Sequence, residues 1–520
     1  MKLGEVKSIL APFNPWWSNP HWSRSDPLLS AARRSILRKP PRLFYHISKR
    51  LPMYGYYGIV TIRGPRRVGK TTLIKMVIEE LISRNRIDPK KIFYVPLDYK
   101  KLRKIDLFEL IEAIARFSGE KYVFIDEASM YKEWALVLKN VVDAGLVEQG
   151  RLKTVVTGSH SMDLADAASK LRGRQGRLAS KFNLGGNLVH TPLRFIEVLE
   201  ALKPNIDDYL RKHNLRKPSE RFSILLELKK GNIPRQLEEF YSEFMALLEE
   251  SFNSYLLHGG FPKAIDQYHR EEVIDSTFYH DFGNLIISDS ENAGLSPENT
   301  RRVIEFLTEP SRLSSTIGLE KRENIGKLVV RVDQEGFPQA KFRLGEYLEY
   351  LETTRIFFFP YREDKSKKCT PNYRADRKIY VLDPFAYFAL RSHVENEADP
   401  LGFSINLLKD EGFKGRLVES IVAAHLIMAQ QFFEHVPSVD YHKVLFYFRK
   451  DSETDYIICM QRQGIKYRFV VESKYRRRIP GVSDANIVLT KDKLEEKAIE
   501  GEKKVKKQVH IPVELFLVLF

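Results

Sequence analysis

Cysteine is nearly absent from this 520-residue sequence, which contains only Cys369 and Cys459. Two cysteines so far apart along the chain are too few for a disulfide framework or for a zinc site with four protein ligands. The cysteine content therefore favours a protein of a reducing compartment.

Long apolar runs are also missing. The C-terminal stretch Ile511–Phe520 is broken by Pro512 and Glu514, and the N-terminus reaches Pro12 without the apolar core of a signal peptide. With 43% hydrophobic and 12% aromatic residues, the composition is equally unlike that of a disordered chain. We expect a cytoplasmic protein with no membrane partner and, from its length, about three or four domains.

Positive charge is in excess and unevenly placed. The chain has 84 Lys plus Arg against 68 Asp plus Glu, a formal net charge of +16. Residues 1–50 carry ten basic and two acidic side chains, and residues 441–520 carry seventeen and eleven. Concentrated basic surfaces attract polyanions, so nucleic acid is a candidate partner, DNA more than RNA. A solvated surface that keeps the protein soluble is the alternative.

A phosphate-binding motif follows the first apolar segment. Residues Gly58–Ile62 predict a buried strand, Gly64–Thr71 fit the G-x-x-x-x-G-K-[ST] pattern, and Thr72–Ser83 predict a helix. Glycines let the backbone N–H groups face phosphate oxygens, and the helix N-terminus adds a favourable dipole. We expect Lys70 to reach the β- and γ-phosphates of ATP and Thr71 to be a ligand of Mg²⁺. The predicted ATP-binding residues are Gly64, Pro65, Arg66, Arg67, Val68, Gly69, Lys70, Thr71 and Thr72.

A second apolar strand, Lys121–Ile125, ends in two carboxylates, as in a Walker B motif. Asp126 would hold Mg²⁺ through the water shell of the ion, and Glu127 would orient or deprotonate the attacking water. Both acids are therefore predicted to serve ATP hydrolysis.

A third strand, Lys153–Val156, ends in Thr157-Gly158-Ser159 and places hydroxyl groups beside the γ-phosphate, with Ser159 as the candidate catalytic sensor. Alternation of strands and helices predicts a parallel sheet with nucleotide outside its carboxyl ends. A basic loop follows, in which one side chain would be an arginine finger or all would be solvated. Its candidates are Arg172, Arg174 and Arg177.

Several motifs taken together resemble those of archaeal-type AAA+ ATPases, relatives of STAND signalling NTPases that carry a C-terminal nuclease-like domain. They are Phe13-Asn14-Pro15-Trp16-Trp17, the loop Gly64–Thr72, Thr157–Ser159, Pro192–Glu197 and Gly259-Gly260-Phe261-Pro262. Arg194 departs from the pattern, which has a small Ser at this position. The resemblance covers nearly the whole chain.

This resemblance implies an α/β fold class. Its parts would be a P-loop parallel sheet flanked by helices, a helical lid, a winged-helix-like module and a restriction-endonuclease-like α/β domain. The corresponding segments are a basic N-terminal arm at 1–50, the ATPase core at 51–205, the lid at 206–295, the winged-helix-like module at 296–400 and the PD-(D/E)xK nuclease-like domain at 401–520.

Two of these segments left alternatives open. In the arm, Trp16, Trp17 and Trp22 would either stack on bases or pack onto the next domain. In the winged-helix-like module, the candidate recognition helix Lys341–Glu352 carries a net charge of −1, which suits protein packing better than a groove lined by phosphates.

Carboxylates and a lysine recur in the last segment, where the pattern reads as a helix at 415–429, strands Val444–Phe448, Asp455–Met460 and Ile465–Glu472, then a helix and a final strand. Such carboxylates bind one or two Mg²⁺ or Mn²⁺ ions, which activate water for phosphodiester cleavage. The predicted metal ligands are Glu419, Asp455 and Glu472, and the predicted catalytic residues are Asp455, Glu472 and Lys474.

The leading hypothesis is therefore a Mg²⁺-dependent AAA+ ATPase that couples ATP hydrolysis to a nuclease-like domain acting on nucleic acid, with possible homo-oligomerisation. The alternative is an ATP-driven switch or scaffold whose C-terminal domain is catalytically silent. A nucleic-acid translocase is a third reading.

Overall fold

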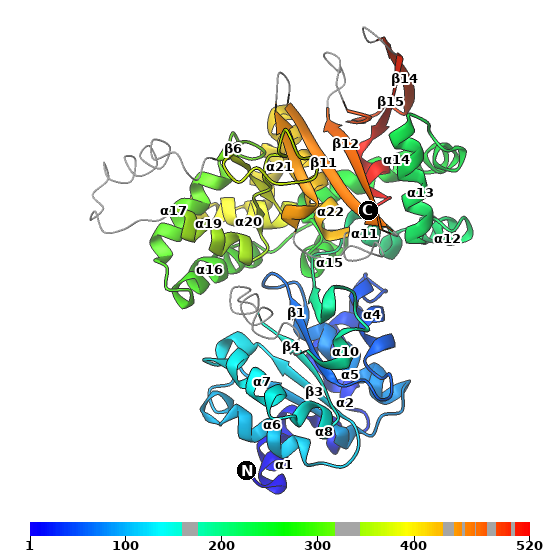
Figure 1. The fold of residues 1–520 in the computed structure, drawn as a ribbon. Coiled ribbons are helices and arrows are strands. Elements are labelled where there is room, and N and C mark those ends of the chain that lie inside the picture. The colour runs from blue at the N-terminus through cyan, green and yellow to red at the C-terminus, as the bar shows by residue number, and fades with distance from the viewer. Residues whose placement is uncertain are drawn as a thin grey trace. The chain divides into compact units, whose positions relative to one another are not determined.

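The computed structural model describes residues 1–158, 175–317, 344–429, 441–449, 453–462, 464–475, 485–500 and 505–520. They form two compact units, Met1–Thr191 and Pro192–Phe520 (Figure 1). The finer division into five segments stays a prediction. Within the described ranges, every helix is too short or too polar to traverse a lipid bilayer.

The first unit is built on a five-stranded sheet with the order β2-β3-β4-β1-β5, in which all neighbours are parallel. Its strands are β1 Gly58–Arg63, β2 Ile92–Pro96, β3 Lys121–Asp126, β4 Leu152–Thr157 and β5 Asn187–Val189. The predicted parallel sheet is therefore confirmed, and the carboxyl ends of β1, β3 and β4 meet at one edge.

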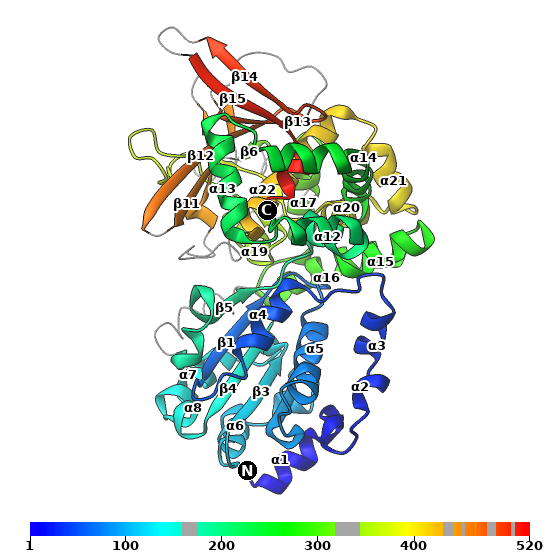
Figure 2. The same cartoon turned by 90° about the vertical axis from the view of Figure 1, so that its right-hand side faces the viewer.

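Helices cover both faces of this sheet, which is why its strands read as continuous apolar runs. Successive residues of β1 face opposite cores: Ile59 packs in the cluster with α6 and α7, whereas Val60 packs in the cluster with α4 and α5. Figure 2 shows α5 on one side of the sheet and α7 and α8 on the other. The helices are α1 Leu3–Leu10, α2 Trp22–Ser25, α3 Pro27–Arg34, α4 Arg42–Arg50, α5 Lys70–Ser83, α6 Leu107–Ala115, α7 Trp134–Asp143, α8 Leu146–Gln149 and α10 Gly176–Ala179.

The N-terminal arm is attached to the edge strand β2 by side-chain hydrogen bonds. Asn14 Nδ2 donates to the Tyr94 carbonyl at 2.9 Å, and the Tyr94 N–H donates back to Asn14 Oδ1 at 2.7 Å. The indole N–H groups of Trp16 and Trp17 both donate to the Ile92 carbonyl. Since Trp16 and Trp22 are also only 3% exposed, the packing alternative is confirmed for these aromatic side chains.

The second unit contains a six-stranded mixed sheet with the order β10-β11-β12-β13-β15-β14. Its strands are β10 Leu445–Arg449, β11 Glu453–Arg462, β12 Ile465–Ser473, β13 Ile487–Thr490, β14 Glu495–Glu500 and β15 Val505–Pro512. The helix α22 Glu411–Ala429 packs on it and is buried on all sides from Ser420 to Ala429. The predicted order of one helix followed by three strands is confirmed.

The following helix was predicted wrongly. Between Ser473 and Pro512, the described residues form no helix; they form strand β13 and the hairpin of β14 and β15 instead. Strand β15 also pairs with β13, where Ile487 lies opposite Val509. Pairing on both sides of β15 outweighs the local preference of a lysine-rich segment. Lys503 and Lys504 lie outside the described residues.

Residues 206–295 are largely helical, as predicted. Besides α22, this unit has helices within that segment and on either side of it. They are α11 Phe195–Leu202, α12 Pro204–Lys212, α13 Pro218–Lys230, α14 Arg235–His258, α15 Pro262–Glu271, α16 Ser276–Asn292, α17 Pro297–Thr308, α19 Leu344–Thr353, α20 Pro384–Glu395, α21 Pro400–Leu407 and α23 Val513–Leu517. Of the candidate recognition helix, Lys341 and Arg343 lie outside the described residues. Short pairs join β6 Thr316–Ile317 to β8 Arg377–Lys378 and β7 Phe357–Phe358 to β9 Tyr380–Val381.

Two of the motif segments lie side by side in this unit. Gly259 has φ +60°, and a Cβ there would lie 2.0 Å from Asp383 Oδ1, so only glycine fits. The Gly260 N–H donates to Asp383 Oδ2 at 2.6 Å, while the Gly260 carbonyl accepts from the Leu193 N–H at 2.8 Å. The unusual Arg194 is 1% exposed and bridges Glu197 to the Phe520 carbonyl.

A disulfide bond joins the two cysteines, which are 90 residues apart in sequence, with a Cα–Cα distance of 5.8 Å. We interpreted two cysteines so far apart as too few for a disulfide framework, but the segment after Glu363 folds back over β11 and brings Cys369 to Cys459. The expectation of a reducing compartment rested on that interpretation and loses its support.

We predict that Cys369→Ser lowers the free energy of unfolding by about 2–4 kcal/mol, because a bridge across a long loop restricts the unfolded chain. Denaturant unfolding with and without dithiothreitol checks this: the reductant should lower the wild type to the level of the variant. A wild type indifferent to reductant would contradict the prediction.

Candidate functional site

The predicted phosphate loop connects β1 to α5. Gly69 caps the helix with φ +97°, and a Cβ on Gly64 would lie 2.0 Å from the His190 carbonyl oxygen. The side chain of Lys70 is 95% buried and donates from Nζ to the carbonyls of Gly64 and Pro65, at 2.9 and 3.0 Å. The loop therefore curls around its own ammonium group at the positive end of a helix, a geometry suited to an anion.

The Walker B carboxylate, Asp126, lies at the end of β3 and is 3% exposed. Its Oδ1 accepts a hydrogen bond from the hydroxyl of Thr157, and its Oδ2 accepts one from the hydroxyl of Tyr94 at 2.8 Å. The hydroxyl donors come from both neighbouring strands, β4 and β2. Burial and the adjacent Asp126 raise the pKa of Tyr94, so this donor keeps its proton.

Glu127 follows in a left-handed conformation with φ +50°. Its N–H donates to Thr157 Oγ1 at 3.3 Å, and its Oε1 lies 3.9 Å from Nη1 of Arg66 in the phosphate loop. Residues from the ends of β1, β3 and β4 are thus brought together, as the motif spacing predicts. Of the other predicted residues, Ser159, Arg172 and Arg174 lie outside the described residues, and Arg177 lies 3.9 Å from Glu148.

A cavity of about 530 Å³ opens beside these groups. Arg66, Thr71, Asp126 and Glu127 line one part of it, and arm residues including Trp22 and Asp26 line another. Thr71 and Asp126 offer the oxygen ligands that Mg²⁺ prefers, so the residues fit a magnesium–nucleotide complex.

Sequence reasoning missed the contribution of Lys75 and Tyr94 to this cavity. Lys75 Nζ lies 3.4 Å from Asp26 Oδ2 and 4.5 Å from the centre of the Tyr94 ring, with Trp16 and Trp22 also within cation–π distance. Burial lowers the pKa of Lys75. These contacts join Lys75 to residues 19 to 59 positions away, and the sequence offered no signal for them.

The C-terminal carboxylates divide into two groups. Lys474 Nζ lies 2.5 Å from Glu472 Oε1. Asp455 Oδ2 accepts from the Ser473 N–H at 2.8 Å, while Asp455 Oδ1 and Glu419 Oε1 both bind Nζ of Lys378, at 3.0 and 2.6 Å. Burial and the nearby Asp455 raise the pKa of Glu419.

A metal ion does not fit this arrangement. The ammonium of Lys378 stands between Glu419 and Asp455, where a shared ion would have to lie. Glu419, Asp455 and Glu472, all described, do not bring one carboxylate oxygen each within 4.8 Å of one another. The metal ligands and the catalytic roles of Asp455, Glu472 and Lys474 therefore remain predictions.

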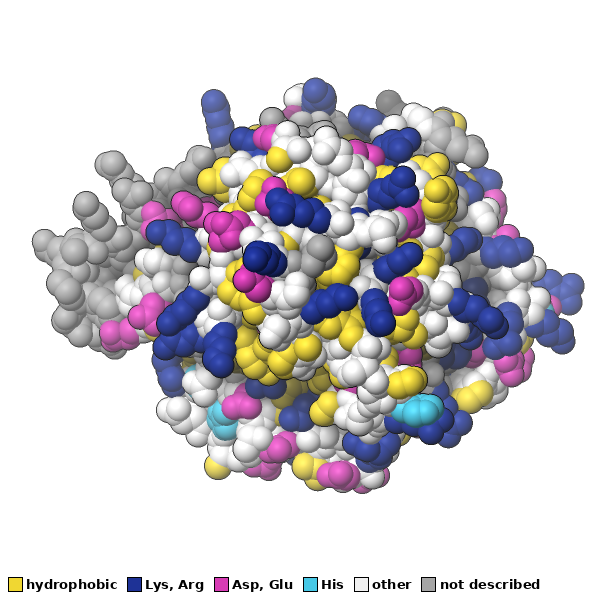
Figure 3. Space-filling view, turned by 90° about the horizontal axis from the view of Figure 1, so that it is seen from below, with side chains coloured by type: hydrophobic (Ala, Val, Ile, Leu, Met, Phe, Trp, Pro, Cys, Tyr) yellow, Lys and Arg dark blue, Asp and Glu magenta, His cyan; other side chains and the backbone are white. Residues whose placement is uncertain are grey.

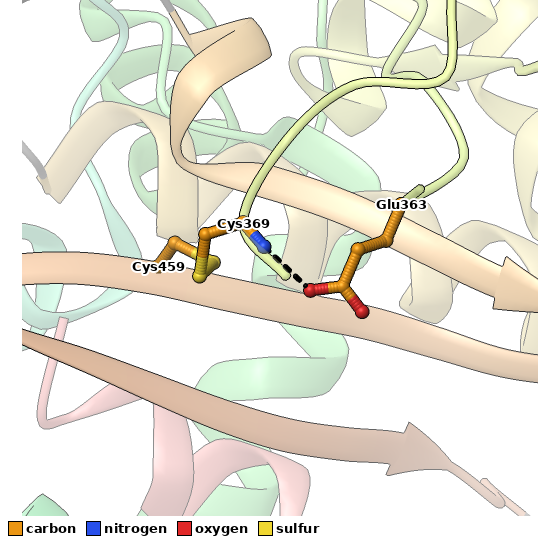
Figure 4. A group of neighbouring side chains, drawn as sticks. All are labelled: Glu363, Cys369 and Cys459. Atoms are coloured by element: carbon orange, nitrogen blue, oxygen red, sulfur yellow. Dashed lines mark hydrogen bonds between the residues drawn. A yellow bond between two sulfur atoms is a disulfide. The ribbon is translucent and has the colours of Figure 1, made fainter. Parts of the chain in front are cut away.

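In the described ranges, a different group does have three metal-type ligand atoms within 4.8 Å of one another. It consists of Glu363, Cys369 and Cys459 (Figure 4). Its two sulfurs are bonded to each other. Glu363 accepts from the Cys369 N–H and from Nε and Nη2 of Arg468. These contacts define a structural clasp rather than a metal centre.

The surface in Figure 3 bears on the nucleic-acid hypothesis. On this face, Lys and Arg side chains are spread among Asp, Glu and hydrophobic side chains and do not form one continuous stripe. The view therefore adds no support to nucleic-acid binding, which stays a proposal.

Comparison with known proteins supports the nucleotide site. Residues 56–199 match a family described as an AAA domain, and residues 249–397 match a family described as a domain of unknown function. An uncharacterized protein of Methanocaldococcus jannaschii is 26% identical over 214 residues, a match that spans 40% of this chain and 39% of the relative.

Two solved structures are similar at low identity. A Walker-type ATPase of Pyrococcus abyssi is 17% identical, with 67% of this chain and 94% of that chain covered and a TM-score of 0.35. The ORC1 protein of Aeropyrum pernix in complex with DNA is 13% identical, with 71% and 94% covered and a TM-score of 0.30. TM-scores below 0.5 do not establish a shared overall architecture.

The first unit therefore contains a P-loop ATPase domain of the AAA type, as its motifs, its strand order and the match over residues 56–199 together show. The nuclease-like identity of the C-terminal domain stays a prediction.

We predict that Tyr94→Phe reduces ATP hydrolysis about tenfold and raises the Mg²⁺ concentration needed for half-maximal rate, because Asp126 loses one of its two hydroxyl donors. Steady-state hydrolysis measured against Mg²⁺ concentration checks this. Tyr122→Phe is the matched control, since its hydroxyl contacts Lys153 instead. Equal magnesium dependence in both variants would refute the role of Tyr94.

Proposed function

We propose that the protein is a Mg²⁺-dependent ATPase that acts as an ATP-driven switch, in which the nucleotide state of the first unit controls what the C-terminal domain binds. The observation that carries the proposal is the convergence of Lys70, Thr71, Asp126 and Glu127 at one edge of the parallel sheet. ATP with its magnesium ion supplies the phosphoanhydride bond to be cleaved.

The side chains of the site divide the work of hydrolysis. Lys70 exchanges its carbonyl partners for the β- and γ-phosphates, and the N–H groups at the start of α5 donate hydrogen bonds to the phosphate oxygens. Glu127 orients the attacking water and takes its proton. Phosphate bound in the loop competes with Glu127 for Arg66, so ATP binding releases the carboxylate for this role. Ser159 is the proposed sensor of the γ-phosphate.

Nucleic acid, DNA more than RNA, is the proposed partner of the C-terminal domain. Its support is the basic excess of residues 441–520. Binding without cleavage is the version that we favour, because an ammonium group occupies the space between Glu419 and Asp455.

A metal-dependent nuclease is the second candidate. The observation in its favour is that Asp455, Glu472 and Lys474 lie at the same end of the β11–β12 hairpin, with Glu472 paired to Lys474. Homo-oligomerisation is compatible with either version.

We predict that Lys70→Ala weakens ATP binding at least about tenfold, whereas Glu127→Gln preserves binding and slows hydrolysis about a hundredfold. Binding of a fluorescent ATP analogue and phosphate release, measured on the same samples, separate the two effects. Hydrolysis by Lys70→Ala at the wild-type rate would remove the ATPase half of the proposal.

Incubation of labelled single- and double-stranded DNA with Mg²⁺ or Mn²⁺, with and without ATP, distinguishes the two candidates. We expect bound but intact DNA, since ammonium groups already pair with the carboxylates. Cleavage that is lost in Lys474→Ala would establish the nuclease instead.

A further inference from the structure

The contacts of Lys378 set it apart from the other basic side chains near the C-terminal carboxylates. Its side chain is 1% exposed, and Nζ binds Glu419 Oε1 at 2.6 Å and Asp455 Oδ1 at 3.0 Å. Charge pairs so well removed from water persist only when their hydrogen bonds are satisfied. Lys378 therefore forms an ion pair with each of the two carboxylates.

The surroundings hold this lysine in place. Its backbone N–H donates to the Pro360 carbonyl at 3.1 Å, and its strand β8 pairs with β6. Nζ also lies 5.7 and 6.0 Å from the ring centres of Tyr380 and Tyr447. The Tyr380 hydroxyl donates to the same Glu419 oxygen at 2.9 Å. The ammonium group is therefore surrounded by two carboxylates and two tyrosine rings.

We infer that Lys378 is the resident cation of the Glu419–Asp455 pair, in the position that a divalent metal ion would otherwise take. A metal bridging the same two oxygens must stand about 2.1 Å from each, inside the space that Nζ fills. The two cations exclude each other sterically and by charge. The Glu419–Asp455 pair therefore needs no divalent ion to balance its charge. Instead, the two carboxylates connect α22 and β11 through Lys378.

This inference deepens, and rests on, the proposed function of a C-terminal domain that binds its partner without cleaving it. Lys378 was not part of the predicted motif, because it precedes Glu419 by 41 residues and lies on a different strand from Glu472. The motif lysine, Lys474, pairs with Glu472 and is 32% exposed, so it provides a matched control.

The test is a titration of the protein with Mn²⁺ in the absence of nucleotide. The concentration of free Mn²⁺ is measured by electron paramagnetic resonance, and the bound ion is obtained by difference. The variants are Lys378→Met, the control Lys474→Met, and Lys378→Met combined with Asp455→Asn. We expect Lys378→Met to gain one Mn²⁺ site, because the competing charge is gone. Its dissociation constant for that ion should be at least about tenfold lower than any the wild type shows for the same site. The double variant should lose this site, and Lys474→Met should resemble the wild type.

Thermal unfolding supplies a second readout on the same samples. Lys378→Met should melt at a lower temperature than the wild type in EDTA and recover part of the loss with Mn²⁺. If Lys378→Met does not fold, wild type and Asp455→Asn still decide the question, since both should bind Mn²⁺ equally. Mn²⁺ binding by the wild type that Asp455→Asn abolishes, or no gain in Lys378→Met, would overturn the inference. ATP hydrolysis by the same proteins shows separately whether the ATPase half of the proposed function holds.

Discussion

The common direction of the five strands in the first unit is the constraint on which its site depends. Because β1, β3 and β4 are parallel neighbours, the loops at their carboxyl ends emerge at one edge and bring Lys70, Asp126 and Thr157 together. The strand order also places β2 beside β3, so that the Tyr94 hydroxyl reaches Asp126. The N-terminal arm is bonded to β2 through Asn14. The position of the Walker B carboxylate, Asp126, is therefore linked through Tyr94 to Asn14, which lies 112 residues earlier in the sequence.

Buried lysines recur where the protein gathers polar groups. Lys70 is held by two loop carbonyls, Lys75 lies among aromatic rings beside Asp26, and Lys378 pairs with two carboxylates. An ammonium with all its donors used is stable in such a place, whereas an unpaired one is not. The buried lysines of the two units differ in the charge of their partners. In the first unit Lys70 has uncharged carbonyl partners, whereas Lys378 has carboxylate partners.

Elements with strong local signals were predictable. The phosphate loop, the apolar strands of the parallel sheet and α22 with its three following strands all appear at or near their expected positions. The failures involve segments whose structure depends on distant partners. Strand β15 forms between β13 and β14, with which it pairs on its two sides, and Cys369 meets Cys459 because a loop folds back over β11. Neither partner can be read from local composition or spacing.

The sequence by itself determined the ATPase class, since the loop from Gly64 to Thr71 and the acids after β3 have few alternative uses at that spacing. Only the tertiary structure decided what neutralises the C-terminal carboxylates. Asp455, Glu472 and Lys474 fit a metal-site pattern in one dimension, but Lys378 reaches Asp455 and Glu419 from β8. The physical reason is that charge compensation acts through space over about 3 Å, whatever the separation along the chain.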